Sequence, residues 1–135
     1  MKKKVSKSDY EALASFRYAL RQFFRFSENA VQGVGLTPQQ HQALLAIEGF
    51  PARNYASVSE LAERLQLAHH SVVGLLDRME KAGWITRGSS PDDKRIVLVR
   101  ASSEGRNLLR RLTRAHKAQL RQFGPEMIAS LQNLH

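Results

Sequence analysis

The sequence contains no cysteine, and this absence excludes several classes of protein at once. Without thiols the chain cannot form disulfides, build a thiolate zinc site or sense oxidants through cysteine. The sequence also has no apolar run of membrane-spanning length, and Met1-Lys2-Lys3-Lys4 lacks the apolar stretch of a signal peptide. We therefore expect a cytoplasmic protein that has no membrane partner.

Motifs that mark enzymes are missing as well. There is no glycine-rich phosphate loop and no nucleophile motif, and the acidic residues show no pairing beside a base. The sequence therefore predicts a protein that is not an enzyme, with no catalytic residues and no cofactor.

Acidic side chains are scarce relative to basic ones. The chain has 12 Asp and Glu against 21 Lys and Arg, which gives a formal charge of +9. Such a balance favours an anionic partner, and among DNA, RNA and an anionic membrane surface the motifs described next favour DNA.

The segment from Ser57 to Gly83 has the pattern of a helix-turn-helix. Ser57 and Glu60 form a capping-box pattern at the start of the first helix, and Gln66-Leu67-Ala68 is the expected turn. Apolar residues then recur with helical spacing at Val72, Leu75, Leu76 and Met79. The second helix should end at Gly83, where a left-handed residue costs little.

A β-hairpin with a polar tip should follow the second helix. Ile85-Thr86-Arg87 and Ile96-Val97-Leu98-Val99 read as short strands, and turn-forming residues fill Gly88–Lys94 between them. The preceding segment 51–56 is expected to be a loop. A helix-turn-helix followed by such a hairpin is typical of a DNA-reading module, so double-stranded DNA is the predicted partner.

Long amphipathic helices are expected at both ends of the chain. One should cover about residues 8–31, and a second helix should begin at Thr37-Pro38-Gln39-Gln40 with Thr37 as its cap. After the hairpin, Ser102 or Ser103 should cap a helix reaching about Phe123, where Gly124-Pro125 is expected to break it before a short last helix. The terminal helices are too apolar to stand alone, which predicts a homodimer.

Taken in order, these motifs give the chain a family likeness. It resembles the MarR family (multiple antibiotic resistance regulators) of winged-helix transcription factors. The likeness is carried by Leu36–Gln40, Ser59–Leu65, Leu76–Ile85 and Asp92–Val99. It implies one mostly α-helical domain with a small β-hairpin, in which residues 36–101 form the winged helix-turn-helix and residues 8–35 and 102–135 form dimerisation helices.

The resemblance also implies a DNA-reading surface. The recognition helix would enter the major groove, Arg95 would reach the minor groove, and Asp93 would orient Arg95. Two residues depart from the family pattern, because Ala68 stands at a position that often caps the recognition helix and Gly74 stands where Arg is common. The predicted DNA-binding residues are His69, His70, Ser71, Val73, Gly74, Arg78, Asp93, Lys94 and Arg95.

Members of this family often bind small aromatic or anionic effectors. The candidate ligand-binding residues here are Phe16, Phe23 and His41, although an aromatic stripe at helical spacing is equally well explained as core. No metal site is expected, because adjacent His69 and His70 point about 100° apart on a helix. His41 and His116 lack any cysteine or further histidine at ligand spacing.

The favoured function is a ligand-responsive repressor that binds a pseudo-palindromic operator as a homodimer. An architectural DNA-binding protein without an effector is the alternative, since it would account for the high charge. A winged helix that binds only proteins is a third possibility.

Overall fold

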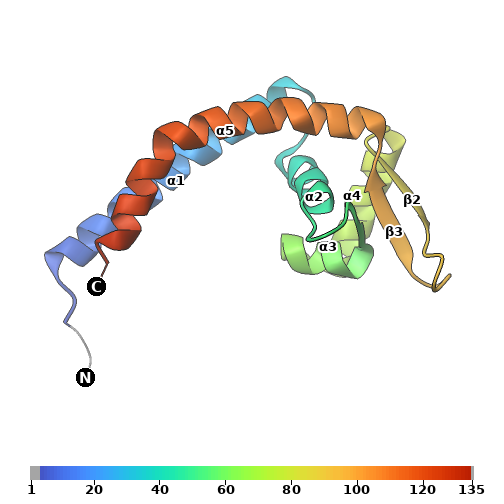
Figure 1. The fold of residues 1–135 in the computed structure, drawn as a ribbon, viewed down its shortest axis with the longest axis horizontal. Coiled ribbons are helices and arrows are strands. Elements are labelled where there is room, and N and C mark those ends of the chain that lie inside the picture. Colours follow the sequence, from blue (N-terminus) through green and yellow to red (C-terminus); the bar gives the residue numbers. More distant parts are fainter. Residues whose placement is uncertain (1–3, 135) are drawn as a thin grey trace. The chain divides into compact units, whose positions relative to one another are not determined.

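The computed structural model describes residues 4–134, and residues 1–3 and 135 lie outside this range. The described chain is mostly helical with one small antiparallel sheet, which confirms the predicted fold class (Figure 1). The elements are α1 (Lys7–Gly33), α2 (Pro38–Glu48), β1 (Tyr55–Ser57), α3 (Val58–Leu65), α4 (His69–Lys81), β2 (Ile85–Ser89), β3 (Val97–Ala101) and α5 (Ser103–Gln132).

The chain divides into two compact units. The winged unit runs from Val31 to Leu112 and contains the short helices and the sheet. The two-helix unit consists of the residues up to Ala30 together with those from Thr113 onward. Helices α1 and α5 therefore each contribute residues to both units, and each unit is described by itself below.

The predicted helix starts are confirmed by their hydrogen bonds. Thr37 Oγ1 accepts from the Gln40 amide at 3.2 Å, and Gln40 Oε1 accepts from the Thr37 amide at 3.1 Å. Ser57 and Glu60 form the same reciprocal pair at the start of α3. Each capping box satisfies amide groups that have no partner inside the helix, so these starts are defined locally.

The core of the winged unit is formed by the faces predicted to be apolar. The residues of α4 at positions 72, 75, 76 and 79 are all buried, and they share the core with Leu44, Ile47 and Leu61. The sheet adds Ile85 and Val99. Burial of each such side chain contributes about 1.5–3 kcal/mol, so this core is the main source of the unit's stability.

The sheet has one strand more than the sequence predicted. Strand β1 pairs with β3, with Tyr55 opposite Arg100 and Ala56 opposite Val99, so the strand order is β1-β3-β2. The expectation of a loop over 51–56 was therefore wrong for Tyr55 and Ala56. Three residues are too few for a periodic pattern, and their extended form depends on the free edge of β3.

The start of α5 depends on Ser102. Its hydroxyl donates to the carbonyl of Gly83 and accepts from the amide of Gly105 at 3.0 Å. Gly105 allows a close approach here, because a Cβ at this position would lie 2.2 Å from the carbonyl oxygen of Trp84. Ser102, rather than Ser103, therefore makes the capping contact and joins α5 to the end of α4.

Helix α5 does not break at Gly124-Pro125. It continues to Gln132 with Pro125 inside it, so the predicted short last helix is part of α5. Proline removes one backbone donor and strains the preceding turn, at a cost of about 3 kcal/mol. Buried side chains lie on both sides of this point, at His116 and Ser130, so the helix is packed before and after the proline.

The two-helix unit buries His116 together with a few small residues. His116 Nε2 lies 2.7 Å from Ser27 Oγ, and the rings of Phe23 and Phe26 meet the His116 ring edge-on. Ala12 and Ala19 are buried, whereas the large side chains of Leu13 and Phe24 on the same helix are 49% and 52% exposed. Within one chain, the large apolar side chains of this unit are therefore only partly covered.

Candidate nucleic-acid interface

Helix α4 presents a polar face opposite its buried stripe. His69, His70, Ser71 and Arg78 are exposed on this face, and Val73 is half-buried beside them. Ala68 stands at the N-cap and makes no side-chain capping bond, so the first amide groups of the helix receive no acceptor from their cap residue. The positive end of the helix dipole and these amides favour a negatively charged partner.

Gly74 lies in the middle of α4, and the protein itself does not require a glycine there. A Cβ at this position would meet only Arg78 Nη1, at the ordinary contact distance of 3.5 Å. Glycine inside a helix costs roughly 0.5–1 kcal/mol relative to alanine. Gly74 therefore lowers the stability of α4, and no close contact inside the winged unit requires a glycine at this position.

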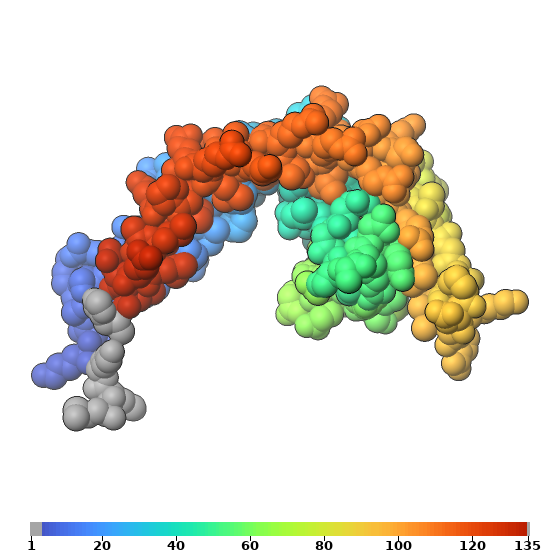
Figure 2. Space-filling view, in the orientation of Figure 1, coloured from blue at the N-terminus to red at the C-terminus, as the bar shows by residue number. Residues whose placement is uncertain are grey.

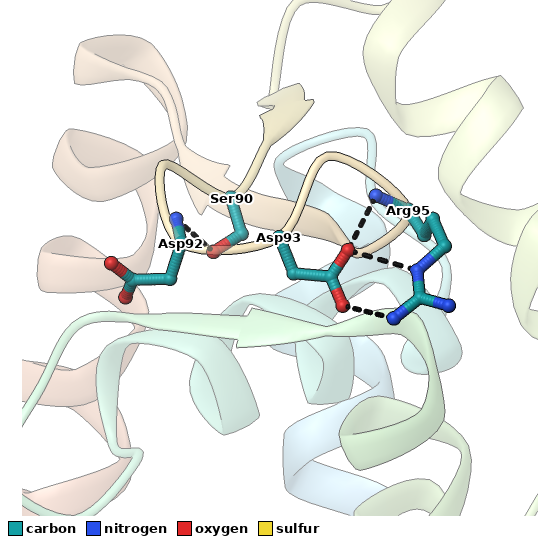
Figure 3. A network of polar contacts seen from close by, with 4 residues as sticks. All are labelled: Ser90, Asp92, Asp93 and Arg95. Atoms are coloured by element: carbon teal, nitrogen blue, oxygen red, sulfur yellow. Dashed lines mark hydrogen bonds and ion pairs between the residues drawn. The ribbon is translucent and has the colours of Figure 1, made fainter.

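The tip of the β2–β3 hairpin is ordered by a contact between Asp93 and Arg95 (Figure 3). Asp93 Oδ1 accepts from the Arg95 amide at 3.0 Å and from Nε at 3.1 Å, while Oδ2 accepts from Nη2 at 3.0 Å. The hydrogen bonds from Arg95 hold the pKa of the Asp93 carboxyl below its ordinary value. The same contact raises the pKa of the Arg95 guanidinium.

The hairpin tip stands clear of the rest of the winged unit. Figure 2 shows the segment around residues 90–95 extending beyond the body of this unit. The Arg95 side chain is 90% exposed although Asp93 holds it, and Lys94 beside it is also exposed. The turn is closed by two backbone bonds, from the Ser90 amide to the Ile96 carbonyl and from the Ile96 amide to the Asp93 carbonyl, so the arginine is presented from a defined loop.

Sequence reasoning missed the role of Arg87. Its guanidinium bridges Asp77 and Glu80 of α4, at 2.7 Å and 2.9 Å. The hydrogen bonds that Arg87 donates to Glu80 and Asp77 raise the pKa of Arg87, and the bond to Glu80 lowers the pKa of Glu80. This contact fastens the hairpin to α4, and it could not be found from spacing because it depends on how β2 packs against the helix.

The predicted effector residues belong to different units. Phe16 is half-buried on α1 and Phe23 contacts His116, both in the two-helix unit. His41 is buried on α2 in the winged unit, with its Nδ1 3.3 Å from Gln42 Nε2. An effector site built from these residues stays a prediction.

Neither a metal cluster nor a membrane helix is found within residues 4–134. No three His, Asp or Glu side chains in this range are grouped so that they could hold a metal ion. Among the helices of the same range, none combines the length and the apolar character needed to cross a bilayer.

The structure has the architecture of a winged helix-turn-helix protein, in which α3 and α4 form the helix-turn-helix and the β2–β3 hairpin forms the wing. Comparison with known proteins shows which family the chain belongs to. The profile of the MarR family matches residues 34–96. The chain is 32% identical over 118 residues to the transcriptional activatory protein BadR of Rhodopseudomonas palustris, across 80% of this chain and 67% of BadR. The chain therefore belongs to the MarR family of transcriptional regulators.

Two further relatives show the extent of the likeness. The transcriptional regulator PapX of Escherichia coli is 33% identical over 80 residues, which cover 59% of this chain and only 49% of PapX. The chain thus spans about half the length of that relative. A crystal structure of mutant MarR from Escherichia coli with operator DNA has the same fold, with a TM-score of 0.68 and 21% identity over 86% of this chain and 84% of that one.

Proposed function

We propose that this protein binds a pseudo-palindromic operator as a homodimer and represses transcription from it. The observation that carries the proposal is the hairpin tip, where Asp93 holds the exposed guanidinium of Arg95 in one orientation. A narrow minor groove concentrates negative potential and attracts such a guanidinium. The pre-ordered side chain loses less entropy when it binds.

The polar face of α4 supplies the second contact in this proposal. A helix fits the major groove of B-form DNA, where its exposed side chains can read base edges. His70, Ser71 and Arg78 provide donors at this face, and Gly74 lets the helix backbone approach the bases closely. The formal charge of +9 adds phosphate attraction, which raises affinity without selecting sequence.

The exposed apolar side chains of the two-helix unit support the homodimer. Leu13 and Phe24 on α1, together with Ile128 at 58% and Leu131 at 54% exposure on α5, leave large apolar surface uncovered in a single chain. Soluble proteins rarely leave such patches in water unless a partner covers them. A second copy related by two-fold symmetry would cover them and present two recognition helices to two half-sites.

Repression is the proposed direction because it needs only occupancy of a promoter. Response to a small aromatic or anionic effector remains part of the proposal, with Phe16, Phe23 and His41 as its candidate residues. We place the protein in the cytoplasm because its proposed partner is chromosomal DNA. The high net charge supports one other function, that of an architectural protein that binds DNA without regard to sequence.

Competition binding separates the two functions. Genome-wide occupancy first gives the preferred sequence, and the affinity for this duplex is then compared with that for a scrambled duplex at physiological salt. A specific regulator should prefer its site by a factor on the order of 10³ or more. Equal affinity for both duplexes would reject the regulator and favour the architectural protein.

A further inference from the structure

Three arginines and two aromatic rings alternate along one side of the winged unit. The Arg64 guanidinium lies 4.9 Å from the centre of the Phe50 ring, and that of Arg53 lies 4.0 Å from it. Arg53 also lies 5.0 Å from the centre of the Tyr55 ring, and Arg100 lies 4.3 Å from the same ring. We call this series, Arg64-Phe50-Arg53-Tyr55-Arg100, the arginine ladder.

Only the middle arginine of the ladder is neutralised. Arg53 forms an ion pair with Glu60. Burial alone would raise the pKa of Glu60, but its hydrogen bonds from Ser57 and Arg53 outweigh this and hold it below its ordinary value. Within residues 4–134, no carboxylate lies at ion-pair distance from Arg64 or Arg100, so two positive charges remain at the ends of the ladder.

The ladder connects the two parts of the proposed DNA interface. Its Arg64 end lies beside Leu65 and Leu67, at the turn between α3 and α4. At its other end, Arg53, Tyr55 and Arg100 line a hollow of about 490 Å³, whose opposite wall is formed by Ser90–Asp92 at the hairpin tip. The ladder therefore spans the side of the unit from the helix-turn-helix to the hairpin.

Stacking prepares these guanidinium groups for phosphate. A planar guanidinium covered on its flat face by an aromatic ring keeps its N–H groups at the edge, where they match phosphate oxygens. Arg100 Nη1 lies 3.5 Å from Asn54 Oδ1, which further restricts its side chain. Less side-chain entropy is then lost on binding than for free arginines.

We infer that the arginine ladder binds the DNA backbone between the recognition helix and the hairpin, as a phosphate contact that adds affinity but reads no sequence. The inference rests on the proposed function. We choose the sugar-phosphate backbone of DNA as the occupant, because the ladder extends from the turn before α4 to the hairpin tip, and these are the two elements proposed to read DNA. An anion enclosed in the hollow would face the carboxylates of Glu60 and Asp92. A DNA strand that follows the ladder instead meets Arg100 beside this hollow and Arg64 beside Leu65 and Leu67.

The test compares charge-removing variants on two duplexes. Arg64→Gln, Arg100→Gln and the double variant are titrated with the selected operator and with a scrambled duplex between about 50 and 300 mM salt. Each lost phosphate contact should reduce the slope of log K against log salt by roughly 0.9, which is roughly fivefold in affinity at 0.15 M salt. Both duplexes should weaken by the same factor, so the preference between them is unchanged.

Two further variants identify the cause. Arg110→Gln removes the same charge from an exposed residue of α5 outside the ladder, and it should lower the slope much less. Tyr55→Leu keeps every charge but removes the ring between two arginines, so affinity for both duplexes should fall while the slope changes little. Thermal unfolding of each variant shows whether β1 is intact, and Phe50→Leu provides a second stacking variant if Tyr55→Leu is unstable.

The outcomes separate the ladder from the proposed function. If the wild-type protein binds operator and the double variant keeps the wild-type slope, the ladder is not a DNA contact, and a protein partner would then be the better explanation for it. If the double variant loses affinity for operator alone, the ladder reads sequence and the inference is wrong. A wild-type protein that binds no duplex at low salt overturns both the ladder and the proposed function.

Discussion

The Asp93 carboxylate accepts hydrogen bonds from both the backbone amide and the guanidinium of Arg95. One acidic side chain therefore sets the backbone of the hairpin tip and the direction of the Arg95 guanidinium, which is 90% exposed. Because the pair is solvent-exposed, it adds little to the stability of the fold. The pair instead restricts the Arg95 side chain before binding, so less side-chain entropy is lost when a partner binds.

The Asp93–Arg95 pair predicts a coupled loss of DNA binding. Arg95→Ala should leave the fold unchanged and weaken operator binding by roughly 1–3 kcal/mol per site. Asp93→Ala should cost less, because the arginine remains but is less well ordered. The double variant should then lose less than the sum of the single losses. Equilibrium titration of the four proteins measures the coupling.

Lys94→Ala is the matched control for this cycle, since Lys94 is an exposed cation of the same turn and forms no ion pair with a carboxylate of residues 4–134. It should produce a smaller loss that does not depend on Asp93. Normal operator binding by Arg95→Ala at physiological salt would show that the hairpin tip does not contact DNA.

Gly74→Ala should separate stability from binding. The added Cβ has room beside Arg78, so the variant should gain about 0.5–1 kcal/mol in free energy of unfolding. If α4 approaches the bases closely at this point, the same methyl group should weaken operator binding. Urea unfolding and operator titration measure the two effects.

Gly33→Ala is a suitable control because this glycine is also helical, does not precede a proline, and a Cβ there meets nothing within 4 Å. It should raise stability without changing affinity for DNA. A Gly74→Ala protein that binds operator as tightly as the wild type would mean that the backbone of α4 does not lie close to the bases.

A charge at Leu131 should disrupt the homodimer. Leu131 is 54% exposed in the single chain, and in the proposed dimer it is covered by the second copy. Leu131→Asp would bury an unpaired carboxylate, which is costly, so the protein should become monomeric or unfold. Sedimentation velocity measures the change. Gln132→Asp adds the same charge at the neighbouring exposed residue, and an equal effect of both variants would reject this placement of the interface.

The Arg87–Glu80 contact predicts acid sensitivity of the winged unit. The pKa of Glu80 is lowered below its ordinary value of 4.5 in the folded protein. A depressed pKa contributes stability that is fully present above the unfolded value and is lost as the pH falls through the folded value. The free energy of unfolding should therefore be insensitive to this group between about pH 6 and 8, and should fall below about pH 4.5.

Arg87→Gln tests this cause directly. The variant should be less stable at neutral pH and should show a shallower decrease in acid, because Glu80 has lost the partner that lowers its pKa. Denaturant unfolding at several pH values between about 3 and 7 measures both effects. Parallel profiles for the variant and the wild-type protein would contradict the assignment.

Local signals in the sequence determined the helix starts and the buried face of the recognition helix. Thr37 and Ser57 lie three residues before a glutamine and a glutamate, and a capping box needs only this spacing. The stripe of Val72, Leu75 and Met79 follows the helical period, so its burial was predictable from α4 alone. The contact between Asp93 and Arg95 was anticipated through the resemblance to the MarR family, whose pattern has an Asp two residues before this Arg.

Only the tertiary structure decided the features that depend on distant partners. Strand β1 pairs with the edge of β3, and α5 continues through Pro125 where the local sequence predicts a break. Arg87 reaches Glu80 through the packing of β2 on α4, and Tyr55 lies against Arg100 through strand pairing. Such contacts join residues whose separation in the chain has no fixed relation to their distance in space, so no local pattern encodes them.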